Sequence, residues 1–530
     1  MKSHKIIGFT FAAAVILGIT SCDKDKFLDV NTDPNNPLVA APSNLLPSTA
    51  ITTGFANGNE INRITSLLVQ HVAGTGTQSA PQDVYNIRGG LDNQWQNELY
   101  AGALQNAQSM IEAADRLNSP AYAGIGKLLK AYNFAMTTDL WGDIPYSQAL
   151  QGLGNLQPRF DTQQDIYKGN AALGVQSLFD LVKEGLADLD KTSTFNPSGT
   201  DDPIYGGSLV KWKKMGNTML LKLANTVSRR DPDLAKSIIN EVLNKGAASY
   251  ISANADDFEV PFGSSVGSRN PIYTFNYDNR TTDILLSQRL LDSMAVRNDP
   301  RLPFFFTTTP TPDLKSNPQV NPTGTTTTLP GPTAGTFLTF TGYQNGTPGA
   351  GPGVLANRSR YGSYVIGSST TPGGVGGAPI RLLTNFQRLF IQAESALILG
   401  TQGDPQALLR DAVRASMVKA GVADVAVTAY FAANPTLVTL SGRTDAASKQ
   451  KDLNKIMTQK WIAWVGNGYE AYNDYRRTGF PRLALALNPQ GDNGTLPVRF
   501  VYPASESSGN ANNTPNPLPG TAERVWWDID

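Results

Sequence analysis

Residues 91–138, LDNQWQNELYAGALQNAQSMIEAADRLNSPAYAGIGKLLKAYNFAMTT, decide the fold class of this chain. Apolar side chains recur at helical spacing in two runs, and only a short linker before Pro120 separates them. The first run is formed by Leu91, Trp95, Leu99 and Ala103, and the second by Tyr122, Ile125, Leu128, Leu129, Tyr132 and Met136. Because the linker is so short, the two segments predict a pair of antiparallel helices.

Similar helical patterns continue along the chain. They predict helices at about 165–189, 208–229, 232–245, 283–297, 380–400, 405–420 and 446–466. Pro232 and Pro405 stand at helix starts and Gly400 follows a helix end, as helix punctuation requires. Such helix pairs resemble tetratricopeptide units, although no clean 34-residue period is present. The sequence therefore predicts a mainly α scaffold with irregular tetratricopeptide-like pairs.

The composition excludes several classes of function. The chain has 530 residues, with 44 basic and 44 acidic side chains, so it carries no basic field for nucleic acid. It has two histidines and one cysteine, which excludes disulfides within the chain and zinc sites built from Cys and His. We therefore expect no metal-dependent chemistry of that type and no nucleic-acid partner.

The N-terminus predicts a lipoprotein signal peptide at residues 1–21. Lysines at positions 2 and 5 precede the apolar run 6–19, which is shorter than the roughly 20 residues that cross a bilayer. The following Ile-Thr-Ser-Cys resembles the lipobox of bacterial lipoproteins, which implies cleavage before Cys22 and acylation of Cys22, for example with palmitate. The charged DKDK at 23–26 resembles the surface-export signals of Bacteroidota lipoproteins. Contact with the membrane is therefore expected through the lipid anchor alone.

The remaining chain predicts a polar linker and one folded domain. Residues 22–42 form the lipidated cysteine and its linker, and residues 43–530 form a single domain. Within it, the Gly/Pro/Thr-rich segment 305–378 has only four charged residues, so we expect a loop-rich insertion packed over the helical body.

Seven motifs in order along the chain resemble the SusD/RagB family of outer-membrane nutrient-binding lipoproteins. They are FLDVNTDPN at 27–35, TDLWGDIPY at 138–146, NDPRL at 298–302, AESA at 393–396, QKW at 459–461 with YRRTGFP at 475–481, PVRFVYPASE at 497–506 and VWWD at 525–528. Ser395 departs from the family's A-E-A pattern.

The resemblance implies a SusD-like helical scaffold and a non-catalytic function. It further implies partnership with a SusC-like TonB-dependent outer-membrane barrel, to which captured oligosaccharide is delivered at the exterior of the cell. Peptide capture by the same kind of importer is an open alternative, since some family members serve peptide uptake.

Three loops carry the mixture of aromatic and polar side chains that sugar binding requires. The first, 78–88, offers Gln78, Gln82, Asp83, Tyr85, Asn86 and Arg88. The second, 270–280, offers Tyr273, Asn276 and Tyr277, and the third, 343–364, offers Tyr343, Arg358 and Tyr361. The competing interpretation of each tyrosine is packing beneath a loop, and the alternation at 273–277 also fits a half-buried strand. The family resemblance favours the first and third loops.

Other polar residues are better explained by structural roles. Asp139 and Asp143 are a carboxylate pair of the kind that a glycosidase uses, but a helix end and a tight turn account for both. Glu394 lies in an apolar segment, so it predicts a buried carboxylate paired with Arg476 or Arg477. His71 is expected to be a satisfied structural residue.

Two further expectations concern aspartates and tryptophans. The pairs Asp201-Asp202 and Asp256-Asp257 could ligate a structural Ca²⁺, but they lack the spacing of a dedicated site and solvated turns fit them better. No other cofactor is expected. The core is predicted to include Trp461, Trp464, Trp526 and Trp527.

Two other classes of function compete with nutrient capture. A surface-anchored glycosidase would need a carboxylate pair without a local structural role. A tetratricopeptide-like scaffold that binds only proteins would need a groove without sugar-binding tyrosines.

Overall fold

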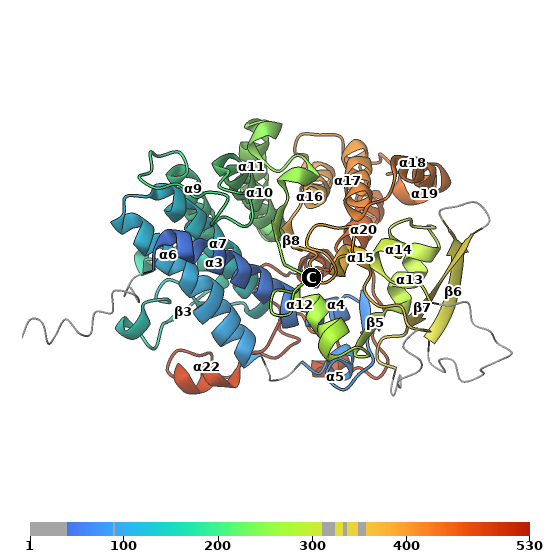
Figure 1. Cartoon of the computed structure of the whole chain (residues 1–530), viewed down its shortest axis with the longest axis horizontal. Helices are drawn as coiled ribbons and strands as arrows, with labels where there is room; N and C mark the ends of the chain where they lie inside the picture. The colour runs from blue at the N-terminus through green and yellow to red at the C-terminus, as the bar shows by residue number, and fades with distance from the viewer. Residues whose placement is uncertain are drawn as a thin grey trace, which may run out of the picture.

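A computed structural model describes residues 40–87, 89, 91–309, 324–331, 336–347 and 357–529. Cys22, Arg88 and the signal peptide lie outside these residues. Long helices dominate the fold (Figure 1), so the prediction of a mainly α scaffold is confirmed. Among the described residues, no helix combines the length and the apolar character needed to cross a membrane.

The helices fall into successive groups along the chain. The first group comprises α3 (Pro42–Ala56), the π-helix η2 (Asn57–Ile61), α4 (Asn62–Leu68), α5 (Ala80–Asp83), the π-helix η3 (Asn93–Leu104), α6 (Gln105–Arg116) and α7 (Pro120–Trp141). The second comprises α8 (Gln163–Lys168), α9 (Leu178–Asp188), α10 (Leu209–Val227), α11 (Pro232–Asn244), α12 (Pro271–Tyr273), the π-helix η8 (Thr274–Asn279), α13 (Gln288–Ala295) and α14 (Leu302–Phe305). The third comprises α15 (Ser363–Ile366), α16 (Asn385–Leu399), α17 (Pro405–Ala420), α18 (Asp424–Ala433), α19 (Pro435–Val438), α20 (Ala446–Ala463), α21 (Gly468–Thr478) and α22 (Ala504–Gly509). Short 3₁₀ turns lie at Gly152–Gly154, Ala171–Leu173, Ala247–Ser249, Asn254–Asp256 and Asp492–Gly494.

The predicted helix pairs form where the sequence punctuates them. Helix α7 begins at Pro120, whose missing N–H costs nothing at the first helical position, and α6 packs against α7. Helix α16 ends at Gly400 in the left-handed region, with φ of 65°. Helix α17 then begins after Asp404, whose carboxylate accepts N–H bonds from the first turn. Both antiparallel pairs are therefore confirmed.

Three predicted helices differ from the structure at their boundaries. The segment 165–189 is divided into α8 and α9 by a loop that begins at Gly169, where φ is 81°. The segments 283–297 and 380–400 begin as strands, and only their later parts are helical. Pairing with distant strands decides these two starts, and a local pattern cannot reveal such a partner.

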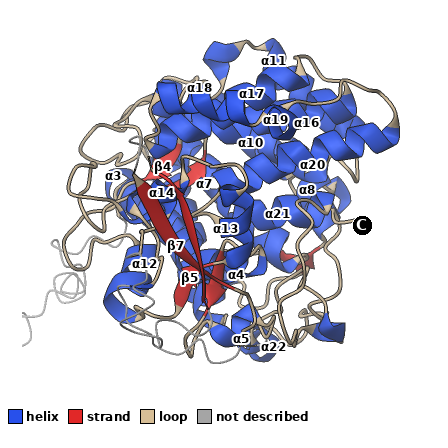
Figure 2. Ribbon diagram, turned by 90° about the vertical axis from the view of Figure 1, so that its right-hand side faces the viewer, coloured by secondary structure: helices blue, strands red, loops and turns tan. Residues whose placement is uncertain are grey.

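The described strands form short antiparallel pairs, and two of these pairs, β1–β5 and β4–β8, join segments that are more than one hundred residues apart. The strands are β1 (Val72–Gly74) with β5 (Ile284–Leu286), β2 (Ile144–Pro145) with β3 (Phe160–Asp161), β4 (Phe258–Val260) with β8 (Ile380–Leu383), and β6 (Gly324–Pro330) with β7 (Phe337–Tyr343). Figure 2 shows strands β4, β5 and β7 on one side of the long helices. The hairpin of β6 and β7 lies in the predicted insertion, and the described part of this segment is therefore more regular than the expected coil.

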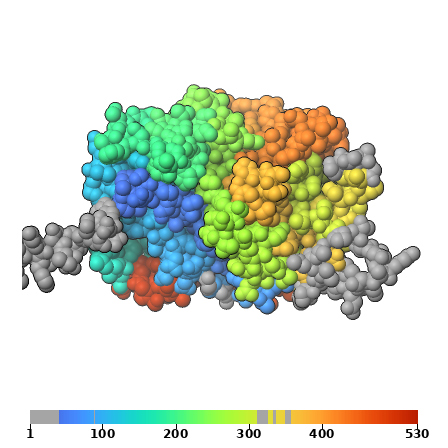
Figure 3. Space-filling model, in the orientation of Figure 1, coloured from blue at the N-terminus to red at the C-terminus, as the bar shows by residue number. Residues whose placement is uncertain are grey.

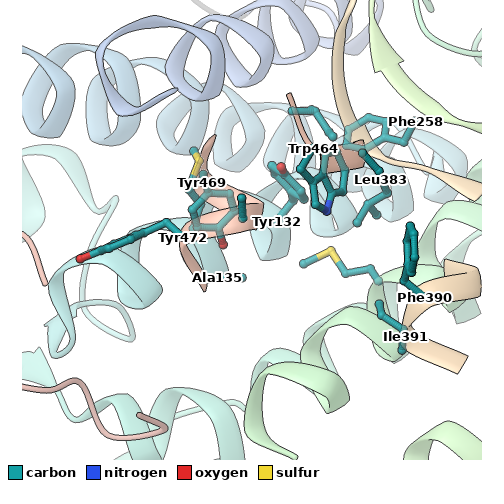
Figure 4. Packing of buried hydrophobic residues seen from close by; sticks show 14 of the residues in the cluster. Tyr132, Ala135, Phe258, Leu383, Phe390, Ile391, Trp464, Tyr469 and Tyr472 are labelled. Carbon is teal, nitrogen blue, oxygen red and sulfur yellow. The ribbon is translucent and has the colours of Figure 1, made fainter. Parts of the chain in front are cut away.

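The core is a continuous apolar cluster around α7. Nearly every side chain of α7 is buried, because other helices cover it on all sides. Figure 4 shows part of this cluster, where Tyr132 of α7 lies among Tyr469, Tyr472 and Trp464 from the C-terminal part of the chain. The tryptophans at 461, 464 and 527 are buried as predicted, and Trp526 is half-buried.

Candidate functional site

The strand pair β1–β5 brings the first predicted loop to the second. Val72 pairs with Leu286 and Gly74 with Ile284, so the residues after β1 and before β5 emerge together. Beyond the strands, the backbone N–H of Gln78 donates to the Asp283 carboxylate at 3.1 Å. These contacts hold the residues around Gln78 beside the end of the second loop.

Asp83 ties the first loop to the third. Its carboxylate accepts hydrogen bonds from the Asn345 amide, at 2.6 Å, and from the backbone N–H of Gly346. The Asn345 amide also donates to the carbonyl of Val72 at 2.8 Å. Burial raises the pKa of Asp83 to about 7, which outweighs the effect of its hydrogen-bond donors. Asp83 is therefore a buried structural carboxyl group between two loops.

Tyr277 and Arg360 tie the second loop to the third. The Tyr277 hydroxyl donates to the carbonyl of Tyr361, and the Arg360 guanidinium donates to the carbonyl of Asn276. The guanidinium carbon of Arg360 also lies 3.6 Å from the ring centroid of Tyr277. The structure thus brings all three predicted loops together. We call this surface, formed by the described residues of 78–87, 269–280, 343–347 and 357–364, the three-loop site.

The predicted ligand residues differ in their access to solvent. Gln78 and Asn86 are exposed, whereas Gln82, Tyr273 and Tyr277 are half-buried. The buried ones are Asp83, Tyr85, Asn276, Tyr343, Arg358 and Tyr361. Arg88 lies outside the described residues, as does the predicted lipidation site Cys22. Only the first two groups can touch a ligand without a change in packing.

The buried tyrosines have structural partners. The Tyr85 hydroxyl accepts a hydrogen bond from the backbone N–H of Ala486 at 2.7 Å. The Tyr361 ring packs against Phe306 with ring centroids 5.4 Å apart. Buried Asn276 donates to the carbonyl of Ile284 at 3.0 Å. These residues shape the loops from below, which is the packing role that the sequence left as the alternative.

Tyr273 and Tyr277 form the centre of a four-layer stack. Segment 271–279 is helical rather than the alternating strand that the sequence also allowed, so the two tyrosines share one face. Their rings lie 5.1 Å apart and nearly parallel, at 6°. Arg360 covers the other face of Tyr277, and Arg269 lies 5.3 Å from the Tyr273 ring. A sugar can therefore reach a tyrosine face here only where Arg269 moves from Tyr273.

Sequence reasoning missed a polar cluster beside these loops. Arg63 of α4 donates to Glu60 at 2.6 Å, and Gln82 donates to the same carboxylate oxygen at 3.1 Å. The Arg63 guanidinium also lies 4.2 Å from the ring centroid of Phe275. Burial lowers the pKa of Arg63, and the neighbouring Glu60 opposes this shift. No local sequence motif predicts this cluster, because its residues come from four separate elements, η2, α4, α5 and η8.

Glu98 extends the cluster onto η3. One of its carboxylate oxygens accepts amide N–H bonds from Asn59 at 2.7 Å, Asn93 at 2.8 Å and Gln94 at 3.4 Å. Burial raises the pKa of Glu98 to about 7 despite these donors. Amide groups both donate and accept, so such a surface suits the hydroxyl groups of a sugar.

A pocket lies between the polar cluster and the second loop. It is lined by Gly58, Asn59, Asn62, Arg63, Pro271, Ile272, Phe275, Asn276, Ile284 and Tyr361. Figure 3 shows the surface of the adjoining segments, where the lime residues around 270–280 lie beside the blue N-terminal helix. The arrangement provides apolar contact together with amide and charged groups.

Asp139 and Asp143, the carboxylates considered for a glycosidase, accept hydrogen bonds from other parts of the protein. Asp139 accepts hydrogen bonds from Tyr167 at 2.6 Å and from Tyr469 at 2.8 Å, and two further donors complete its shell. Asp143 accepts the backbone N–H of Gln163 at 2.8 Å. The role of Asp139 is structural but not local, because its partners come from distant segments.

The predictions for Glu394 and His71 are confirmed. Glu394 is buried and pairs with Arg477, which donates to it through both terminal nitrogens, one of them at 2.8 Å. His71 is fully buried, and its Nε2 lies 2.8 Å from the carbonyl oxygen of Trp461. Burial lowers the pKa of His71 to about 3, so this ring is neutral and structural.

The aspartates considered for Ca²⁺ are not solvated turns. All four are buried, with exposures of 2–8%. Asp202 accepts the N–H groups of Tyr205 and Trp212 among its donors, and Asp257 pairs with Lys419 at 2.9 Å. Within the described residues, no cluster of three or more His, Cys, Asp or Glu side chains is arranged to hold a metal ion.

Comparison with known proteins places this arrangement among related folds. A family model described as "SusD-like_2: Starch-binding associating with outer membrane" matches residues 34–503. No curated protein matches the chain.

Solved structures share the architecture over nearly the whole chain. A SusD homolog from Bacteroides fragilis is 22% identical, with a TM-score of 0.73, and the match covers 92% of this chain and 100% of that one. A chitin-binding SusD homolog from Flavobacterium johnsoniae is 23% identical, with a TM-score of 0.69 and coverage of 92% and 99%. A SusD/RagB family protein from Bacteroides thetaiotaomicron is 22% identical, with a TM-score of 0.68 and coverage of 92% and 99%. Identities of this size show a shared fold.

Proposed function

Because this chain belongs to the SusD-like family, whose model spans residues 34–503, we propose that it captures oligosaccharide nutrients without catalysis. The captured ligand is delivered to a SusC-like TonB-dependent barrel in the outer membrane. The acylated Cys22 anchors the protein at the exterior face of that membrane, and residues 43–530 act as one binding domain. The family description names starch binding, and one related structure is of a chitin-binding homolog.

The observation that carries this proposal is the convergence of three loops beside an amide-rich cluster. Gln78, Gln82 and Asn86 offer amide groups at the surface, and Tyr273 offers a ring beneath the side chain of Arg269, which is paired with Asp278. Sugar recognition requires this combination of hydroxyl partners and an apolar face. We therefore assign ligand contact to these residues, with the buried tyrosines as support.

Binding to insoluble chitin and to starch tests the capture step. The Tyr273→Ala variant removes the ring that a sugar would stack on. The matched control, Phe195→Ala, removes a ring that is 55% exposed in the loop between α9 and α10. We expect about tenfold weaker retention for Tyr273→Ala alone, as the loss of one stacking contact implies. Equal retention of both variants and the unchanged protein would contradict the assignment of Tyr273.

Isolation of the lipidated protein from native outer membranes in mild detergent tests the delivery step. We expect a large TonB-dependent barrel in stoichiometric amount. Recovery of the protein alone, from membranes where it is abundant, would refute the importer proposal.

Peptide capture is the second candidate, because half-buried Glu60 and its buried partner Arg63 offer both charges that peptide termini need. A screen with short peptides discriminates the two. Peptide binding that is lost in Glu60→Gln, with no retention on any polysaccharide, would favour the second candidate.

A further inference from the structure

A second cavity of about 500 Å³ lies outside the three-loop site. Ligand pockets commonly enclose roughly 300–1,000 Å³, so this one is large enough for a small molecule. It is lined by Tyr475, Arg476, Gly479, Leu485, Asn493, Thr495, Leu496, Val498, Ala522 and Arg524. These residues come from the end of α21, the irregular segment that follows it and the last residues of the chain.

The lining is apolar on one part and cationic on another. Leu485, Leu496 and Val498 provide apolar surface, and the half-buried Tyr475 provides a ring. Within the described part of the chain, no acidic side chain lines the cavity, but two arginines do. Asp528 pairs with Arg524 from outside the lining, so the lining itself keeps the charge of Arg476 and the remaining donors of Arg524. An apolar surface with such cationic groups favours an anion that also has an apolar face.

The two arginines differ in how many of their N–H donors are free to bind a ligand. Arg476 is buried and spends its terminal nitrogens on the carbonyls of Asp139, at 2.7 Å, and Val498, at 3.0 Å, and on the Asn473 amide. Its Nε has no hydrogen-bond partner among the described residues. The positive charge of Arg476 therefore lies in the wall of the cavity, and no carboxylate among the lining residues neutralises it.

Arg524 is the more accessible of the two. Its side chain is 41% exposed, and one terminal nitrogen donates to Asp528 at 2.6 Å. The guanidinium of arginine has five N–H donors, so one such bond leaves donors for a second carboxylate. Burial raises the pKa of Tyr475, the charge of Arg524 lowers that pKa, and the carboxylate of Asp528 raises it. The charge of Arg524 is therefore close enough to affect the part of the cavity that Tyr475 lines.

One wall of the cavity is held in place by Gln70 and by two residues of the three-loop site, Tyr85 and Asn345. Leu485 lines the cavity, and its neighbours on both sides are fixed from the other side. The carbonyl of Ala484 accepts from Gln70 at 2.6 Å, the N–H of Ala486 donates to Tyr85, and the N–H of Leu487 donates to Asn345 at 2.9 Å. A wall fixed at residues 484, 486 and 487 is preorganised, and preorganisation lowers the cost of binding.

We propose that this cavity binds a carboxylate-bearing sugar unit, that is, a hexuronate of an acidic oligosaccharide. The planar guanidinium of Arg524 matches a carboxylate in a bidentate arrangement. The apolar face of the sugar ring packs on Tyr475 and Leu496, and Asn493 and Thr495 lie at the rim to pair hydroxyl groups. This site is separate from the three-loop site and does not depend on the function proposed for it.

Titration with methyl β-D-glucuronide and methyl β-D-glucoside, followed by saturation-transfer NMR and calorimetry, tests the proposal on the whole folded chain. We expect saturable binding of the glucuronide and at least about tenfold weaker binding of the neutral glucoside, because only the former has a charge-assisted partner. The glucuronide affinity should also fall as salt is added. Equal affinity for the two glycosides, or no binding of either, would overturn the proposal.

Three variants assign the site. Arg524→Gln should weaken glucuronide binding about tenfold or more and leave weak glucoside binding unchanged. The matched control Arg443→Gln removes an arginine that is likewise exposed and paired with an aspartate, and it should bind as the unchanged protein does. Tyr273→Ala in the three-loop site should also bind the glucuronide normally. Glucuronide binding that is unaffected by Arg524→Gln, or that is lost in Tyr273→Ala, would overturn the assignment to this cavity.

Discussion

Trp527 donates its indole N–H to the carboxylate of Asp139 at 2.9 Å, across 388 residues of the chain. Asp139 lies near the end of α7, and it also accepts hydrogen bonds from Tyr167, Tyr469 and Asn473. Four donors from three separate segments, α8, α21 and the residues around Trp527, therefore converge on one fully buried carboxylate. Such a fully satisfied centre specifies how those segments pack against α7.

Removal of this carboxylate should destabilise the whole fold. Asp139→Ala leaves four buried donors without their acceptor, so we expect the free energy of unfolding to fall by about 3–5 kcal/mol. Urea unfolding followed by tryptophan fluorescence measures the change. Exposed Asp424, substituted by alanine, serves as the control and should change the same quantity by less than about 1 kcal/mol.

The Glu394–Arg477 pair should behave as one unit. Arg477 also donates to Asp474 at 2.9 Å, and Lys460 donates to the same Asp474 oxygen at 2.9 Å, so the pair belongs to a buried network. Glu394→Gln leaves a buried cation without one partner and should cost about 3–5 kcal/mol.

A double-mutant cycle with Arg477→Met checks this coupling. The combined cost of the two substitutions should be smaller than the sum of the single costs by at least about 1 kcal/mol. Additive costs would show that the two side chains act independently.

Asp83 should make stability depend on pH. Its pKa is about 7 in the folded chain and 3.8 as the ordinary value, because burial disfavours its charged form. The folded state therefore binds the proton more tightly than the unfolded state between these values. This contribution to stability is fully present below about pH 4 and is lost as the pH rises towards 7, at up to about 1.4 kcal/mol per pH unit.

Urea unfolding at several pH values from 4.5 to 7.5 tests this effect. The Asp83→Asn variant cannot ionise, so its stability should depend less steeply on pH than that of the unchanged protein. Parallel profiles for the two proteins would mean that Asp83 has an ordinary pKa in the folded chain.

Gln82 should contribute to ligand binding without supporting the fold. Its half-buried side chain links Glu60 to the surface of the three-loop site. Gln82→Ala should weaken the binding of a recognised oligosaccharide by roughly threefold to tenfold, equivalent to one hydrogen bond, and change the free energy of unfolding by less than about 1 kcal/mol. Gln151→Ala, at an exposed position in another loop, is the control for glycan affinity measured by calorimetry.

The helices could be predicted from the sequence because their signals are local. Apolar spacing, Pro120 and Gly400 determine where helices begin and end, whatever the rest of the chain does. The starts of 283–297 and 380–400 could not be predicted as strands, because their partners are β1 and β4, more than one hundred residues away.

The candidate site was predictable only in part, for the same reason. The sequence identified three separate candidate loops, but their meeting at one surface, and whether each tyrosine faces solvent, depend on distant contacts. Tyr85 is covered because Ala486 binds its hydroxyl, and Tyr361 because Phe306 packs on its ring. The Glu60–Arg63 pair was missed because no aromatic or motif residue adjoins it in the sequence. The Glu60–Arg63 pair belongs to the candidate site only because Gln82 binds Glu60 and Phe275 packs against Arg63.

The contact between Asp139 and Trp527 also has a consequence for biosynthesis. Ribosomes add roughly 5–20 residues per second, so Trp527 follows Asp139 after roughly 20–80 seconds. Tyr469 and Asn473 also follow Asp139 by 330 and 334 residues, so for most of that time the nascent segment of α7 lacks three of the four donors of its buried carboxylate. The core around α7 can therefore be completed only after the chain has been translated through residue 527, and the order of synthesis delays the last folding step until the protein is nearly whole.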